Sequence, residues 1–220
     1  MKPRKRSCIP LMVGVLIALV SSCIGVKADI TLRPEGSGTI ELEYRLSRPA
    51  ESLGKLDGNE RWPTIPLGRA DFERTLARVD GLTLRSFSTK TDGKDIIYTV
   101  TLGFSDLRGL AGFLDATGRR AALVQEQGKH RLFLTLISGT ENIDPDLLSL
   151  FTAVTEGYSV SLSFTAPREG TLTLCDAKEN PLGDVPGIRI VPKGRKVSFL
   201  SPLGDLFALA GGAGIGFTWE

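Results

Sequence analysis

The stretch Thr-Ile-Glu-Leu-Glu-Tyr-Arg-Leu-Ser, residues 39–47, alternates apolar and charged side chains without a break. In an extended strand its apolar members share one face: Ile40, Leu42, Tyr44 and Leu46. The charged members share the other face, so we interpret Glu41 and Glu43 as solvated surface and not as a catalytic carboxylate pair. One buried and one solvated face are typical of an antiparallel sheet.

Hairpins and amphipathic helices recur on the C-terminal side of this stretch. Asp92-Gly93 separates two strand-like runs and Gly128 separates two more, which predicts two β-hairpins. Segments beginning at Arg69, Ser105 and Asp144 carry apolar residues at helical spacing, and each ends before a glycine. This order predicts an α+β fold, with a curved antiparallel sheet of hairpins and about three helices on one face.

Two of the predicted strands, at residues 96–104 and 130–137, are apolar on both faces. Either the sheet is covered on both sides, or one face lines an apolar ligand cavity, and periodicity does not distinguish the two. The candidate wall residues of such a cavity are Ile97, Phe104, Phe133, Ile137, Val160, Leu162 and Phe164.

The first 28 residues have the composition of an export signal. Basic side chains near the N-terminus precede an apolar run, Leu11–Val20, that is too short to span a bilayer. Val20-Ser21-Ser22-Cys23 resembles a bacterial lipobox, which predicts acylation of Cys23 and anchorage to a membrane. The alternative is cleavage after Ala28, which would release a soluble periplasmic or secreted protein. We expect a signal peptide at residues 1–28 and a single α+β envelope domain at residues 29–220.

The charge balance changes when the signal is removed. The whole chain has 27 Lys and Arg against 25 Asp and Glu, a formal charge of +2. Four of the basic residues precede Cys23, and the 23 that remain give a formal charge of −2. Such a domain offers no electrostatic basis for binding nucleic acid. Its single histidine excludes a metal site that needs two imidazoles.

No catalytic or cofactor-binding motif is recognisable in the sequence. His130 lies between two basic residues beside a predicted turn, where we expect it to be solvated, and no Gly-x-Ser-x-Gly motif partners it. Asp144 and Asp146 are explained by capping of a helix. Cys175 has no disulfide partner outside the signal. We therefore expect a non-enzymatic protein without a metal or cofactor.

A basic hairpin near the C-terminus is a second candidate contact with a membrane. Its candidate head-group ligands are Arg189, Lys193, Arg195 and Lys196. Such side chains are attracted to anionic head groups, although a solvated hairpin tip also explains them.

The order of elements resembles that of the lipid-binding domain of LppM-like bacterial lipoproteins. The points of resemblance are the lipobox-like Cys23, the opening strand at 36–42, the strand at 160–167 and the closing strand at Trp219. The chain differs from that family at 166–168, where Ala-Pro-Arg replaces the more usual Pro-Gly. The resemblance implies an α+β fold around an apolar cavity, similar to START-like and Bet v 1-like lipid binders.

The sequence thus predicts an exported, lipid-anchored and non-enzymatic envelope protein that binds a lipid, a glycolipid or another apolar ligand. The alternative is a structural or interaction protein of the envelope, with a filled core and no small ligand.

Overall fold

The computed structural model describes residues 24–48, 68–93, 95–115, 120–126, 128–139 and 144–220. One sheet contains β1 (Ile24–Leu32), β2 (Gly38–Ser47), β3 (Leu82–Asp92), β4 (Asp95–Phe104), β7 (Ser159–Thr165), β9 (Arg189–Lys193) and β10 (Lys196–Pro202). The other contains β5 (Ala121–Glu126), β6 (Lys129–Ile137), β8 (Gly170–Cys175) and β11 (Ala213–Trp219). The helices are α3 (Arg69–Leu76), α4 (Leu107–Leu114), α5 (Pro145–Val154) and α6 (Leu203–Phe207). None of these helices is long and apolar enough to cross a bilayer.

The strand order is β3-β4-β2-β1-β7-β10-β9 in the seven-stranded sheet and β5-β6-β11-β8 in the four-stranded sheet. The predicted α+β class is confirmed. The expectation of one antiparallel sheet is wrong in two respects, because there are two sheets and because β1 and β7 pair in parallel. The β5–β6 hairpin pairs with the C-terminal strand β11 and not with the other hairpins. Pairings between such distant segments leave no local pattern in the sequence.

The alternation in β2 is confirmed. Ile40, Tyr44 and Leu46 are buried, whereas Glu41 and Arg45 are exposed. The same division continues in the neighbouring strands, because they pair in register: Ile40 lies between Ile30 of β1 and Leu102 of β4. The central strands of the sheet therefore have one apolar face and one mainly polar face.

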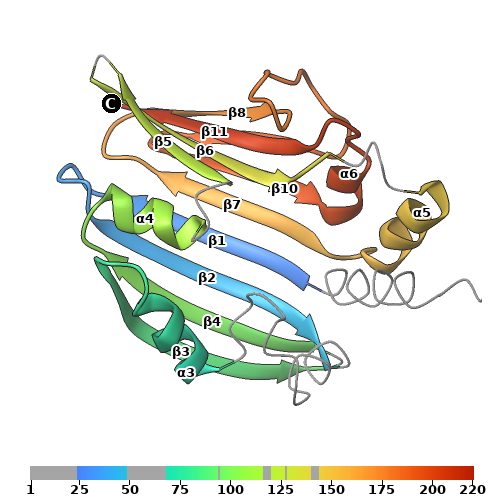
Figure 1. Ribbon diagram of the computed structural model, residues 1–220, viewed down its shortest axis with the longest axis horizontal. Coiled ribbons are helices and arrows are strands. Elements are labelled where there is room, and N and C mark those ends of the chain that lie inside the picture. Colours follow the sequence, from blue (N-terminus) through green and yellow to red (C-terminus); the bar gives the residue numbers. More distant parts are fainter. Residues whose placement is uncertain (1–23, 49–67, 94, 116–119, 127, 140–143) are drawn as a thin grey trace, which may run out of the picture.

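The apolar face is covered by two different layers (Figure 1). At one end α3 packs against it, with the ring of Phe72 6.3 Å from Tyr44 and 5.7 Å from Phe87. At the other end the four-stranded sheet packs against it, and Phe217 of β11 stacks on Phe164 of β7 at 4.6 Å. The hydrophobic core lies between these layers.

The first strand begins inside the predicted signal of residues 1–28. β1 starts at Ile24, directly after Cys23 in the sequence, and not within the predicted domain that begins at residue 29. Ala28 lies in the middle of the sheet, paired with Leu42 of β2 and Leu162 of β7, and it is only 6% exposed. Cys23 and the rest of the predicted signal up to residue 23 lie outside the described residues.

Local turn and cap signals place most of the remaining boundaries correctly. Gly93 and Gly128 have positive φ angles at the two predicted hairpin turns. Asp144 accepts a hydrogen bond from the backbone N–H of Asp146 at 2.9 Å, as expected at the start of α5. The helical segment predicted to begin at Ser105 is capped one residue later, because Asp106 accepts the free N–H groups of the first turn of α4.

Candidate functional site

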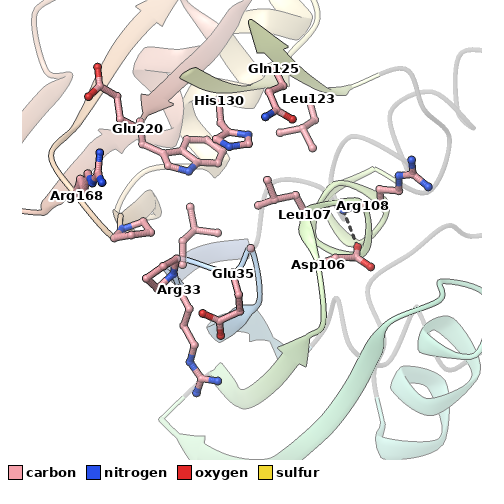
Figure 2. A pocket seen from close by; sticks show the side chains of 15 residues that line it. Arg33, Glu35, Asp106, Leu107, Arg108, Leu123, Gln125, His130, Arg168 and Glu220 are labelled. Atoms are coloured by element: carbon pink, nitrogen blue, oxygen red, sulfur yellow. Dashed lines mark hydrogen bonds between the residues drawn. The ribbon is translucent and has the colours of Figure 1, made fainter. Parts of the chain in front are cut away.

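An open groove of about 880 Å³ lies at one end of the described part of the molecule. Five separate segments bring residues to it: the β1–β2 turn, the start of α4, the β5–β6 hairpin, the chain just after β7, and the C-terminus (Figure 2). A volume of this size falls within the range of small-molecule sites.

The middle of the groove is mainly apolar. Its apolar and aromatic lining residues are Leu32, Pro34, Leu107, Leu123, Pro167 and Trp219. Leu107 and Leu123 are partly buried and pack against the core from opposite sides of the groove. In Figure 2 the Leu107 side chain points from α4 toward the strands that carry Leu123 and His130. An apolar surface shared by two elements in this way would bury a hydrocarbon group favourably.

A ladder of stacked rings connects the core to the groove. Phe164 stacks on Phe217, Phe217 stacks on Trp219 at 5.0 Å, and Trp219 stacks on His130 at 5.3 Å. The expectation that His130 is a solvated tip is therefore wrong, since its ring packs against Trp219 and lines the groove. Its Nδ1 atom is buried without a hydrogen-bond partner among the described residues.

Six charged side chains surround this apolar middle: Arg33, Glu35, Asp106, Arg108, Arg168 and Glu220. The hydroxyl of Ser37 donates to Glu35 at 2.7 Å, and this hydrogen bond lowers the pKa of the Glu35 carboxyl. The backbone N–H groups of Gly109 and Arg108 each donate to Asp106 at 2.9 Å, which lowers its pKa as well.

A smaller hollow of about 310 Å³ lies at the other end of β1, near Val26 and Tyr158. Its arginine, Arg45, lies 3.9 Å from the carboxylates of both Glu43 and Asp92. The charge of Arg45 at this second hollow is therefore partly compensated within the protein.

The seven predicted cavity residues do not share one surface, and none of them lines the 880 Å³ groove. Phe104, Leu162 and Phe164 are buried on the apolar face of the seven-stranded sheet, next to the partly buried Val160. Ile97 is buried on the opposite face of β4, between Arg45 and Lys90 of its neighbours. In the four-stranded sheet, Phe133 lies on the face away from the core, over Gly214, and Ile137 lies opposite Ala213.

The four predicted head-group residues lie on the β9–β10 hairpin, also outside the groove. Arg189 and Lys193 are exposed on β9. Arg195 at the turn donates to the carbonyl oxygen of Pro167 at 3.3 Å, and Lys196 pairs with Asp29 at 2.5 Å. Two of the four side chains are thus engaged within the protein.

Cys175 and possible metal ligands do not form a second site. Cys175 is buried, and burial raises the pKa of its thiol, which disfavours the reactive thiolate. Over the described ranges no three metal-ligating side chains come together.

Sequence reasoning missed the groove because its lining residues come from distant segments. Arg33 and Arg168 were not singled out, since each is one charged residue beside a turn. The alternation of Ile215, Phe217 and Trp219 was the available signal, because it places Trp219 on the buried face of β11. That alternation does not show that His130 is the neighbour of Trp219.

Comparison with known protein families gives no match, and no curated protein matches the chain in sequence. The resemblance to LppM-like lipoproteins therefore stays a prediction.

Proposed function

We propose that this chain is an exported, lipid-anchored envelope protein that binds an apolar or amphipathic ligand in the 880 Å³ groove without acting as an enzyme. The observation that carries the proposal is the composition of the groove, whose apolar middle, including Leu107 and Leu123, is surrounded by charged side chains. Such a site buries a hydrocarbon group while leaving a polar group in contact with water.

The start of β1 supports anchorage through Cys23 over cleavage after Ala28. A cut after Ala28 would remove five of the nine residues of β1. Three of these, residues 26–28, pair with both β2 and β7 in the middle of the sheet. A cut before Cys23 would leave every residue of β1 in place, and an acylated cysteine would then directly precede the sheet.

The two ends of β1 have different roles in this account. Ile24 begins the strand on the side of the proposed anchor, and Leu32 ends it in the groove. At the rise of an extended strand, these residues are roughly 26 Å apart. The groove therefore lies at the end of β1 away from the anchor.

The proposal is tested by the lipids that copurify with the full chain. We expect native mass spectrometry and lipid extraction to find a bound amphiphile, and we expect Leu123→Gln to reduce its occupancy severalfold. Val124→Gln is the matched control, because Val124 is the next residue of β5, is 43% exposed and does not line the groove. Thermal unfolding followed by circular dichroism shows whether both variants retain the fold.

Absence of any copurifying amphiphile, or equal occupancy in folded Leu123→Gln and Val124→Gln proteins, would contradict the proposed groove. An intact mass without acyl groups on Cys23 would contradict the proposed anchor separately.

The alternative is an interaction protein, and the edge strand β9 is the observation that favours it. Ile190 and Val191 are 36% and 54% exposed there, so two adjacent large aliphatic side chains contact solvent at this edge. However, Lys193 and Lys196 form the residue pair that closes a two-residue hairpin turn. In the next residue pair along β9, the backbone nitrogen of Pro192 therefore faces the free edge of the sheet. Proline has no N–H to donate, and it therefore opposes the addition of a further strand.

A further inference from the structure

The start of β1 is held firmly in the seven-stranded sheet. Ile24 pairs with β2, and Val26 pairs with both β2 and β7. A Cβ atom at Gly25 would lie 3.6 Å from the ring of Tyr158, so this ring lies over the strand. The hydroxyl of Tyr158 in turn donates to Asp95 at the start of β4, at 3.4 Å. The first residues of β1 are therefore fixed relative to the rest of the domain.

The predicted anchor joins this strand without a linker. Cys23 directly precedes Ile24 in the sequence, and consecutive Cα atoms are about 3.8 Å apart. A flexible linker would let the domain move away from a bilayer and turn over it, but no residue is left between Cys23 and the sheet to form one. Acylation of Cys23 would therefore bring the start of β1 to the level of the lipid head groups.

Two other parts of the described chain lie at the same end of the molecule as Ile24. The β3–β4 turn is one, because β4 begins opposite the end of β2, and β2 ends opposite the start of β1. The end of α5 is the other, because Tyr158 follows it closely in the sequence and lies over Gly25 (Figure 1). Asp92 at the turn and Glu156 after α5 are both exposed.

The β9–β10 turn lies at the opposite end. Lys193 pairs with Lys196 of β10, which pairs with Thr165 of β7. Thr165 in turn pairs with Thr31, which lies roughly 23 Å along β1 from Ile24 at the rise of an extended strand. This turn, which carries two of the head-group ligands expected from the sequence, is therefore at the end of the molecule that carries the groove.

We propose that the start of β1, Asp92 and Glu156 form a docking surface that lies on the head groups of the bilayer in which acylated Cys23 is anchored. This inference rests on the proposed function, because it requires the acylated cysteine. The groove and the β9–β10 turn then face away from that bilayer. The contact does not require anionic lipids, because the charges at this end have both signs: Arg45 lies 3.9 Å from both Glu43 and Asp92.

The test places a bimane fluorophore on one introduced cysteine of the full acylated chain in phosphatidylcholine vesicles. Some of the lipids carry a nitroxide on the head group, which quenches bimane only at close range. The labelled variants are Asp92→Cys and Glu156→Cys at the docking surface and Lys193→Cys at the opposite end, and all three positions are exposed. The native Cys175 should not react with the label, because it is buried and burial raises the pKa of its thiol.

We expect the nitroxide lipids to cause a loss of fluorescence at positions 92 and 156 and none at position 193. A flexible Gly-Ser linker inserted between Cys23 and Ile24 should abolish this difference, because the domain can then turn over the bilayer. Intact mass spectrometry verifies that Cys23 is acylated in every variant, and circular dichroism verifies the fold.

Three results would overturn the inference. Quenching that is equal at all three positions of the acylated protein, or absent from all three, would reject the docking surface while leaving the proposed anchor and groove intact. A difference that survives insertion of the linker would reject the direct connection of Cys23 to β1 as its cause. Absence of acyl groups from Cys23 would contradict the inference together with the proposed anchor.

Discussion

The two sheets use their faces differently. The seven-stranded sheet has an apolar face that is covered at its central strands and a polar face that carries residues such as Glu41 and Arg45. The four-stranded sheet continues its buried face past the core, so that Leu123, His130 and Trp219 also line the groove. The first sheet therefore supports the fold, while one end of the second contributes to the candidate binding site.

Because of this difference, we expect substitutions between the sheets to affect stability and substitutions at the groove to affect ligand binding. Removing a buried side chain between the sheets should destabilise the whole domain, because Phe164 and Phe217 join them in one core. Changing a side chain at the groove end should alter binding with a smaller effect on unfolding. The following predictions test this separation.

The largest expected effect is that of Phe164→Ala. Phe164 is 1% exposed and contacts the other sheet, so its truncation should lower the free energy of unfolding by about 3–5 kcal/mol. Urea unfolding followed by circular dichroism measures this change. Hydrogen exchange at amides of β2 and β11 should show that both sheets lose protection together. Loss confined to β2 would mean that the sheets unfold separately.

Gly38→Ala, within the seven-stranded sheet, should have the next largest effect. A Cβ atom at Gly38 would overlap the carbonyl oxygen of Thr31 and the ring of Phe104. Overpacking of this kind should cost about 1–3 kcal/mol of stability. Gly183→Ala is the control, because a Cβ atom there would meet no heavy atom within 4 Å. Equal urea midpoints for the two variants would contradict the described packing.

Asp106→Ala should lower stability by about 1 kcal/mol, because it removes the N-terminal cap of α4. Asp106→Asn should retain most of that stability, since an amide oxygen still accepts the backbone N–H groups. The comparison of the two variants by thermal unfolding shows whether α4 depends on the hydrogen bonds of its cap. Equal losses of stability in Asp106→Ala and Asp106→Asn would show that these hydrogen bonds are not the cause.

The same carboxylate predicts a pH dependence. Hydrogen bonds hold the pKa of Asp106 below its ordinary value in the folded protein. The stability that it contributes is therefore present above its unfolded pKa, and it is lost as the pH falls through the folded pKa. The free energies of unfolding of the unchanged protein and of Asp106→Asn should converge as the pH falls through the folded pKa of Asp106. A difference that stays constant throughout acid titration would contradict the linkage.

Lys196→Gln should have the smallest effect. Its ammonium group pairs with Asp29 on the polar face of the seven-stranded sheet, where the two side chains are 43% and 26% exposed. Solvent screens such pairs, so the loss of stability should be about 0.5 kcal/mol or less. A loss above about 2 kcal/mol would show that the polar face contributes more to the fold than the apolar packing implies.

The sequence predicted the parts of this fold that depend on neighbouring residues. The alternation at 39–47, the hairpin turns at Gly93 and Gly128 and the cap at Asp144 all follow from local chemistry. The split into two sheets does not, because it depends on the parallel pairing of β1 with β7 and on the pairing of β6 with β11.

The candidate site was less predictable for the same reason. Strands that are apolar on both faces predicted either a sheet covered on both sides or a ligand cavity. The candidate cavity residues of β7 are instead packed in the core, where Phe164 stacks on Phe217. The groove instead combines the turn after β1 with the stacked pair His130 and Trp219. Their approach depends on strand register, which single-sequence patterns do not specify.

The most direct test of the groove is the position at which a photoreactive ligand attaches to the full chain. After irradiation with a diazirine-bearing fatty acid, peptide mass spectrometry identifies the modified residues. We predict adducts at the β1–β2 turn, at Leu107 and Leu123, and at the C-terminal residues next to Trp219. Adducts confined to Ile190 and Val191 of β9, or none above the background of an unreactive probe, would contradict the account.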